Sequence, residues 1–259
     1  MIDRSIILQE EYMRNYLIFI IILAFQSSAS VVIAEPGSAA DPADQKVLDK
    51  LKSARPDFQF GPVSKTPVEG IYKSAIVNGP TIYLTADGEH FFAGDFFQVG
   101  ANEIVNLGEL EMEKDRVVAL SKLSTDDMIV FGPKNPKVHV YVFTDVDCYY
   151  CQKLHQEVPA LEELGVEIRY LAYPRAGIGS PSYRKIASAW CANDKTASLT
   201  ALKAGQEIPD NVCEPNPVAG QYKLGGQLGV NGTPALVTES GKLLPGYMPA
   251  DKLAAALGL

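Results

Sequence analysis

A cysteine pair spaced C-x-x-C stands between a strand-like run and a helix-like run, and this junction constrains the fold more than any other feature of the chain. The pair consists of Cys148 and Cys151. Residues 138–143, before the pair, have the β-rich pattern of a strand, and residues 152–158, after it, have a helical pattern. A second strand-like run follows at 166–173. The order strand, helix, strand predicts a right-handed parallel crossover.

The position of the pair at the start of a helix predicts redox chemistry. The first N–H groups of a helix have no partners within the helix, and together with the helix dipole they favour a negative charge. A thiolate at Cys148 would therefore be stabilised, and the thiolate is the reactive form of cysteine. Cys151 lies on the same helix face and could resolve a mixed disulfide formed at Cys148. We interpret Cys148 as the nucleophile and Cys151 as the resolving thiol.

The alternatives for this pair are a structural disulfide and half of a zinc site in which His155 is a third ligand. No second pair of Cys or His stands at a zinc-like spacing, because Cys191 and Cys213 are isolated in the sequence. We therefore predict a redox pair, no metal and no other cofactor, and assign no role to His155. One reactive and one structural pair account for the four cysteines economically and fit an oxidising compartment.

An apolar run at 17–25 predicts a secretory signal peptide. It follows Arg14, precedes several small residues, and is too short to span a bilayer comfortably. We predict a signal peptide at 1–34, with Met13 as an alternative start and an uncleaved membrane anchor as the alternative interpretation. The formal net charge of −8 argues against a nucleic-acid partner, which would require a basic face.

The rest of the chain predicts a small N-terminal module, a linker helix and a larger C-terminal domain. We place the module at 41–106, the helix at 107–124 and the domain at 125–259. The module is small for a self-sufficient core and exposes sheet edges, so we predict a homodimer made there; packing against the chain's own second domain is the alternative. We expect the linker helix to be mostly solvated, with a narrow apolar stripe formed by Leu110, Val117, Leu120 and Leu123.

The pattern of apolar runs and turn residues also predicts the individual elements. We expect a break in the active-site helix near Pro159 and a stop at Gly165. The predicted helices are 43–53, 107–123, 152–164, 180–191, 195–203 and 217–228, with one more after 247. The predicted strands are 72–77, 81–85, 90–97, 128–131, 138–143, 166–173, 234–238 and 243–247.

Several short motifs occur together in the C-terminal domain. Phe143-Thr144-Asp145 precedes the cysteine pair and Lys153-Leu154-His155 follows it, and further motifs are Trp190-Cys191-Ala192, Gly232-Thr233-Pro234-Ala235 and Pro245-Gly246-Tyr247. In combination they resemble the DsbC/DsbG family of bacterial periplasmic thiol:disulfide interchange proteins. The N-terminal module matches that family more loosely. The resemblance covers nearly all of the chain after the signal peptide.

The resemblance implies a mixed α+β and α/β fold. A thioredoxin-like catalytic domain with a helical insertion would follow a small cystatin-like α+β dimerisation domain and a linker helix. Thr233-Pro234 would be the cis-proline loop that faces the active-site cysteines and contacts substrate. Cys191 and Cys213 would form a structural disulfide.

The resemblance also implies partners and a location. It indicates a homodimer in the periplasm that holds misfolded disulfide-bonded proteins and is kept reduced by a membrane reductant of the DsbD type. We therefore expect a protein disulfide isomerase or reductase with chaperone-like substrate binding. The alternatives are a DsbG-like sulfenic-acid reductase and a largely non-enzymatic periplasmic chaperone.

Two residues of the active-site motif depart from the family pattern. The dipeptide between the cysteines is Tyr149-Tyr150, where the best-known members have Gly-Tyr. These tyrosines either fill the first helical turn or contact unfolded substrate chains. Asp147 precedes the nucleophile, and a carboxylate disfavours a nearby thiolate whereas a helix N-terminus favours it. The sequence leaves the balance between these two effects, and hence the redox potential, open.

Overall fold

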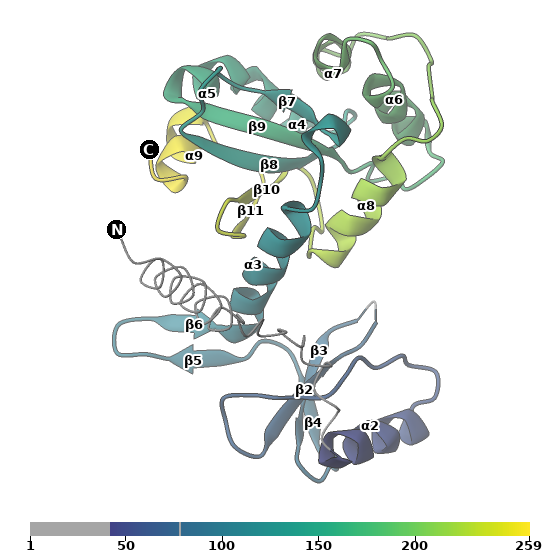
Figure 1. Ribbon diagram of the computed structural model, residues 1–259, viewed down its shortest axis with the longest axis vertical. Coiled ribbons are helices and arrows are strands. Elements are labelled where there is room, and N and C mark those ends of the chain that lie inside the picture. The colour runs from purple at the N-terminus through teal and green to yellow at the C-terminus, as the bar shows by residue number, and fades with distance from the viewer. Residues whose placement is uncertain (1–41, 78) are drawn as a thin grey trace, which may run out of the picture. The chain divides into compact units, whose positions relative to one another are not determined.

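The computed structural model describes residues 42–77 and 79–259, which form two compact units that divide between Gly94 and Asp95 (Figure 1). The predicted signal peptide at 1–34 and the alternative start at Met13 lie outside the described residues. Within the described part of the chain, no helix is long and apolar enough to cross a membrane. The division after Gly94 is N-terminal to the predicted domain boundary at 106, which remains a prediction.

The first unit packs one helix against a four-stranded antiparallel sheet. The strands lie in the order β1-β2-β3-β4, and each neighbouring pair is antiparallel. Val47 and Leu51 of the helix share a core with Ile82 and Leu84 of the sheet. This arrangement confirms the predicted N-terminal helix and the hairpin that follows it. The elements are α2 (Pro42–Ala54), β1 (Ser64–Lys65), β2 (Ile71–Ala75), β3 (Thr81–Thr85) and β4 (Phe91–Ala93).

The prediction of one continuous third strand over 90–97 was wrong. Strand β4 ends at Ala93, and the chain then changes direction at Gly94, whose φ of 141° is a conformation that glycine adopts readily. The residues from Phe97 form β5 (Phe97–Val99), which pairs with β6 (Ile104–Asn106) in a separate antiparallel ribbon. The sequence pattern showed two β-rich runs but not the bend between them.

The second unit contains a five-stranded sheet in the order β11-β10-β8-β9-β7. The central strands β8 and β9 are parallel, as the strand, helix, strand pattern predicted, and Val138 lies opposite Val166. The other three pairings are antiparallel. The strands are β7 (Ile129–Phe131), β8 (Val138–Thr144), β9 (Val166–Ala172), β10 (Ala235–Thr238) and β11 (Leu243–Pro245).

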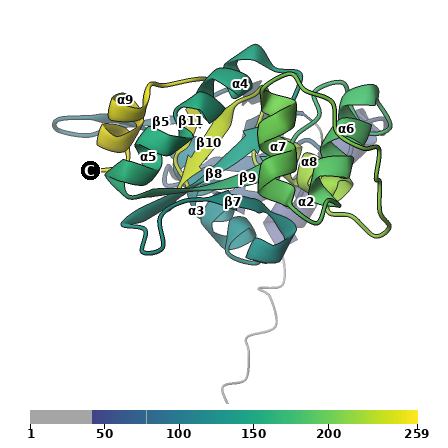
Figure 2. The same ribbon diagram turned by 90° about the horizontal axis from the view of Figure 1, so that it is seen from above.

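Successive side chains of β8 point to opposite faces of the sheet and so join two different cores. Val140 and Val142 share a core with residues of α4, α5, α6, α7 and α9 and with Val218 of α8, whereas Tyr141 and Phe143 share a core with residues of α3 and α8. Figure 2 shows α5 and α9 side by side on one part of this unit and α6 and α7 on another. The helices are α3 (Leu107–Leu120), α4 (Tyr149–Gln156), α5 (Val158–Leu164), α6 (Pro181–Trp190), α7 (Lys195–Lys203), α8 (Val218–Gln227) and α9 (Ala250–Ala256), with a 3-10 turn, η1, at Thr125–Asp127.

Helix α3 differs from the predicted linker helix in length and in the face it buries. It ends at Leu120, and Leu110 and Val117 of the predicted apolar stripe are exposed. Arg116, which the sequence suggested would be solvated, is buried instead, and its guanidinium donates to the carbonyl oxygens of Leu228 and Gly241. These backbone acceptors come from distant segments, so the charge pattern of the helix alone could not reveal them.

The break in the active-site helix is confirmed. Helix α4 ends before Glu157, and α5 begins at Val158 with Pro159 in its first turn. The proline has no N–H to donate, so it is accommodated at a helix start but not in a helix interior. Gly165 then ends α5 with a positive φ of 95°, as predicted.

Candidate active site

The cysteine pair lies directly after the end of the central strand β8. Cys148 is the N-cap residue of α4, and Cys151 lies in its first turn. The backbone turns sharply between strand and helix, because the N–H of Asp147 donates to the Asp145 carboxylate and the N–H of Cys148 donates to the Asp145 carbonyl oxygen. Both cysteines are free thiols, and Cys148 is 3% exposed while Cys151 is fully buried. The helix start therefore holds both sulfurs in a largely desolvated position.

The Thr233–Pro234 segment forms the facing wall of the site. The Cys148 thiol donates to the carbonyl oxygen of Thr233 at 3.2 Å, and the Thr233–Pro234 peptide bond is cis. The side-chain oxygen of Thr233 is buried and, among the described residues, has no hydrogen-bond partner in this dithiol form. It nevertheless lowers the pKa of both cysteines, because the hydroxyl can donate to a thiolate sulfur.

The two cysteines have opposite acidities. A hydrogen bond from Cys151 is the largest influence on Cys148 and, with smaller contributions from Thr233 and Arg175, lowers the pKa of Cys148 to about 5 against the opposing effect of burial. Burial is the largest influence on Cys151 and raises the pKa of its thiol far above the ordinary range. At neutral pH the pair therefore holds one thiolate, on Cys148, and one thiol, on Cys151.

A buried carboxylate and an arginine lie next to the pair. Asp145 accepts from the Ser182 hydroxyl at 2.7 Å and from the backbone N–H of Arg175 at 2.9 Å, and the Arg175 side chain lies 3.2 Å from it. Burial by itself raises the pKa of Asp145, but these hydrogen bonds together hold it below its ordinary value. The charge of Arg175 in turn lowers the pKa of Cys148.

Sequence reasoning did not find Arg175, although a signal was present. Arg175 comes just after the predicted end of strand 166–173, and Cys148 comes just after the end of strand 138–143. Parallel neighbouring strands end at the same edge of a sheet, where α/β sheets place their ligands. Residues that follow two neighbouring parallel strands therefore lie close together, and this rule could have pointed to Arg175.

Lys203 is a second cation that sequence reasoning missed. It is the last residue of α7 and is 4% exposed. Its ammonium donates to the Thr144 hydroxyl and, at 2.9 Å, to the carbonyl oxygen of Asp145. Burial lowers the pKa of Lys203 to about 8. The signal was its spacing, since Lys203 follows the buried Leu199 by four residues and so lies on the buried face of the helix.

Asp147, whose effect on the nucleophile the sequence left open, is paired with a lysine. Its carboxylate lies 2.8 Å from the ammonium of Lys185, and both side chains are about half exposed. The pairing offsets the carboxylate charge at the position before Cys148. The pKa of Cys148 is lowered despite the neighbouring acid.

The two tyrosines between the cysteines are at the surface rather than in the core. Tyr149 and Tyr150 are both exposed, and the Tyr150 ring stacks on Tyr247 with 6.4 Å between ring centroids. The Tyr247 hydroxyl donates to Glu157 at 2.6 Å, and the Lys153 ammonium lies 4.6 Å from the centre of the Tyr247 ring. The site is thus bordered by an aromatic surface, of which the sequence had indicated only the first two rings.

His155, to which the sequence assigned no role, lies in the core of the domain. It is buried, and its ring nitrogens lie 3.1 Å from the Tyr170 hydroxyl and 3.0 Å from the Thr200 hydroxyl. Burial is the main cause that lowers the pKa of His155 to about 4, so the ring is neutral at pH 7. In this structure both ring nitrogens therefore have hydroxyl partners.

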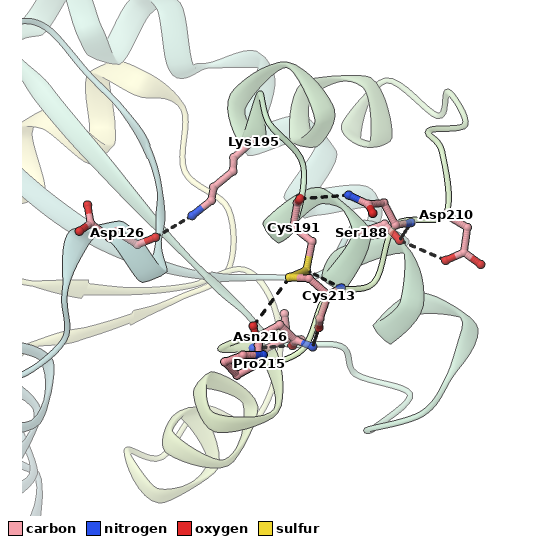
Figure 3. Close-up of a disulfide and its surroundings, with 10 residues drawn as sticks. Asp126, Ser188, Cys191, Lys195, Asp210, Cys213, Pro215 and Asn216 are labelled. Carbon is pink, nitrogen blue, oxygen red and sulfur yellow. Dashed lines mark hydrogen bonds between the residues drawn. A yellow bond between two sulfur atoms is a disulfide. The ribbon is translucent and has the colours of Figure 1, made fainter.

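Cys191 and Cys213 form a disulfide away from the dithiol (Figure 3). It joins the C-terminal end of α6 to the loop before α8, across a sequence separation of 22 residues. Side-chain amides bind the backbone of both cysteines. Asn211 donates to the carbonyl oxygen of Cys191, and Asn216 donates to that of Cys213. In the chain-entropy model a cross-link of this size stabilises a domain by about 3 kcal/mol.

Comparison with known proteins identifies relatives over most of the chain. Residues 125–259 match the family model described as a thioredoxin-like domain, and residues 38–109 match the disulfide bond isomerase protein N-terminal domain. The chain is 34% identical over 240 residues to the thiol:disulfide interchange protein DsbC of Escherichia coli (strain K12), covering 93% of each chain. It is 37% identical over 229 residues to the Haemophilus influenzae protein of that name, covering 88% of this chain and 95% of the relative.

A solved structure is also similar. The disulfide interchange protein from Neisseria gonorrhoeae matches with 33% identity and a TM-score of 0.47, covering 52% of this chain and 96% of that one.

Proposed function

The chain belongs to the DsbC family of thiol:disulfide interchange proteins, and on this premise we propose that it is an isomerase that rearranges non-native disulfides in exported proteins. The observation that carries the proposal is the opposite acidity of the two thiols. Cys148 has a pKa near 5 and is ionised at neutral pH, whereas burial keeps Cys151 protonated. This difference suits isomerisation. The ionised Cys148 attacks readily, whereas the protonated Cys151 attacks slowly, so the mixed disulfide lasts long enough for the substrate to rearrange.

The chemistry follows from this asymmetry. The Cys148 thiolate attacks one sulfur of a substrate disulfide, a mixed disulfide forms, and the other substrate sulfur leaves as a thiolate. That substrate thiolate can attack a different substrate disulfide, and a later attack on the mixed disulfide restores Cys148 without net oxidation. When rearrangement stalls, Cys151 attacks the mixed disulfide, the substrate leaves reduced, and the enzyme pair is oxidised.

Substrate contacts are proposed on both sides of Cys148. On one side, the backbone of Thr233 and Pro234 would pair with an extended substrate segment, as an added strand does. On the other side, the exposed rings of Tyr149 and Tyr150 offer apolar surface that also carries hydroxyl groups. Such a surface suits unfolded chains of varied sequence, because aromatic contacts need no particular partner.

The proposed isomerase needs Cys148 reduced at the start of each cycle. Each reductive release by Cys151 leaves the Cys148–Cys151 pair oxidised, so an external dithiol must return two electrons. We place the protein in the periplasm and assign this role to a membrane reductant of the DsbD type. Both assignments are supported by membership of the family and by the predicted signal peptide at 1–34.

We further propose a homodimer formed by the N-terminal region, 41–106. Supporting it, Val99 of β5 is 78% exposed and its cross-strand partner Ile104 of β6 is 68% exposed. Within the described residues, the β5–β6 ribbon has no third strand. An apolar pair on an uncovered ribbon is a typical site for pairing with a second chain.

Refolding of a scrambled multi-disulfide protein tests the proposed function. The reduced wild-type protein should speed recovery of native disulfides over the uncatalysed reaction, and Cys148→Ala should abolish that gain. Sulfenic-acid reduction without isomerisation would instead favour the DsbG-like alternative. Catalysis that survives Cys148→Ala would contradict the mechanism. Suppressed aggregation without any gain in native disulfides would favour the non-enzymatic chaperone.

A further inference from the structure

A buried ammonium group lies at the strand end that precedes the active-site dithiol, and the mechanism described above does not use it. Lys203 reaches from α7, in the helical insertion, to the end of β8, where it binds the Thr144 hydroxyl and the Asp145 carbonyl oxygen. An ammonium group has three donors, and burying it without a compensating charge is unfavourable. Backbone and hydroxyl acceptors alone give only part of that compensation.

The carboxylates near Lys203 already have partners, so the cysteine pair is the neighbouring group whose charge changes during the reaction. Asp145 is already bound to Ser182 and Arg175, and Asp147 is paired with Lys185. The charge of Lys203 lowers the pKa of Cys151 and of His155. Among the acidic groups around Lys203, Cys151 has the largest charge interaction with it. The titratable groups facing Lys203 are Cys148, Cys151 and His155 from α4, Asp145 and Asp147 from the loop after β8, and Tyr170 from β9.

Lys203 also borders a cavity. The cavity has a volume of about 350 Å³ and lies between α4, α5 and α7. Lys203 and His155 line it, together with the exposed residues Gln156 and Ala204.

We propose that Lys203 is a positioning residue whose buried positive charge stabilises the thiolate of Cys151 in the resolving step. The inference rests on the proposed function, since it concerns the release of substrate from the mixed disulfide. It adds to that function a residue of the helical insertion, Lys203, that sets the rate at which Cys151 releases substrate from Cys148.

In the resolving step, Cys151 attacks the mixed disulfide between Cys148 and the substrate. The Cys151 thiol gives its proton to solvent, and its sulfur attacks the sulfur of Cys148. The bond between Cys148 and the substrate sulfur breaks, and the Cys148–Cys151 bond forms. The substrate sulfur leaves as a thiolate and takes up a proton. Over the whole reaction the substrate disulfide gains two electrons and the two enzyme thiols lose them. Burial opposes the loss of the proton from Cys151, because it raises the pKa of that thiol.

Acid-quenched mixing with glutathione disulfide separates the two chemical steps. Mass spectrometry of the quenched samples follows the reduced protein, the Cys148–glutathione mixed disulfide and the oxidised pair. In Lys203→Met, which keeps the aliphatic stem, formation of the mixed disulfide at pH 7 should stay within about twofold, because a thiol with a pKa near 5 remains ionised there. Decay of the mixed disulfide should slow about tenfold, and its pH profile should move to higher pH.

The matched control is Lys195→Met, which removes the other lysine of α7. That side chain donates to the carbonyl oxygen of Asp126, in the η1 turn rather than in the loop after β8. It should resolve the mixed disulfide at the wild-type rate. Wild-type decay in Lys203→Met, or equal slowing of formation and decay, would overturn the proposal.

If Lys203→Met does not fold, NMR of the wild-type protein with labelled lysine side chains decides the question. One lysine should titrate near pH 8, and oxidation of the cysteine pair should change its titration. A lysine set that titrates uniformly and independently of the redox state would refute the inference. Because the glutathione assay uses no protein substrate, failure of scrambled-protein refolding would sink the proposed function separately.

Discussion

The sulfur of Cys148 lies 3.2 Å from the backbone carbonyl oxygen of Thr233, a residue 85 positions further along the chain. The contact exists because β10 pairs antiparallel with β8, with Ala235 opposite Phe143, so that the start of β10 meets the end of β8. The reactive sulfur is therefore held against the peptide backbone that precedes Pro234.

The hydroxyl of Thr233 should help to keep Cys148 ionised. Replacing it in Thr233→Val preserves the side-chain shape and removes a donor that lowers the pKa of Cys148. A hydrogen bond to a charged group contributes about 1.5 kcal/mol, which corresponds to a roughly tenfold lower thiolate-to-thiol ratio at pH 5. The pH dependence of Cys148 alkylation measures this ratio. An unchanged profile in Thr233→Val would show that the hydroxyl does not act on the thiolate.

The ion pair between Asp147 and Lys185 should reduce the effect of the Asp147 carboxylate on the pKa of Cys148. Lys185→Met leaves the Asp147 carboxylate unpaired, which should raise the pKa of Cys148 and slow its alkylation at pH 5. Half-exposed pairs contribute up to about 1 kcal/mol, so the effect should be about twofold to fivefold and should shrink at high salt. The double variant Asp147→Asn with Lys185→Met should return to the wild-type rate. A double variant as slow as Lys185→Met would exclude this explanation.

Protonation of His155 should destabilise the domain in mild acid. The pKa of His155 is about 4 in the folded protein, whereas an unfolded histidine titrates near 6.5. The unfolded state therefore binds more protons between these values, and the free energy of unfolding should fall as the pH drops from 6.5 to 4, by up to about 3 kcal/mol.

Urea denaturation at a series of pH values measures this dependence. In His155→Gln the slope between pH 6.5 and 4 should flatten, and in the control His90→Gln, at an exposed loop position, it should remain. If both variants keep the wild-type slope, another group is responsible for the acid sensitivity.

The exposed ribbon residue Val99 should be essential for dimerisation. A charged side chain at this position, in Val99→Asp, would be buried without a partner in an interface, so the mature protein should change from a dimeric to a monomeric mass in light scattering. Leu164→Asp alters an exposed apolar residue at the end of α5 and should leave the dimer intact. A monomeric wild-type protein would refute the proposed dimer.

Local pattern was enough to predict most of the elements around the site. The strand at 138–143, the helix after it and the parallel strand at 166–173 are confirmed, as are the helix break at Pro159 and the stop at Gly165. These features depend on residues close together in sequence, such as the missing N–H of proline and the conformational freedom of glycine. The thioredoxin-like fold expected from the motifs is confirmed by the match over 125–259.

Long-range contacts explain the errors. The predicted strand over 90–97 divides at Gly94 because its C-terminal part pairs with β6. Arg116 lies in a helix whose charged sequence predicted a solvated surface. It is buried instead, and it donates to the carbonyl oxygens of Leu228 and Gly241. Pairing partners and backbone acceptors of this kind leave no local signal.

The sequence by itself determined where the dithiol stands, since a β-rich run, C-x-x-C and a helical run place Cys148 at a helix start whatever surrounds it. It also determined that the two thiols would share one helix face. Only the tertiary structure decided their acidities, because these depend on burial and on groups brought in from other segments. Thr233 arrives through the pairing of β10 with β8, Arg175 through the parallel alignment of β9, and Lys203 through the packing of α7 against α4. The motif thus defines the reacting atoms, and distant residues set the charge that each of them carries.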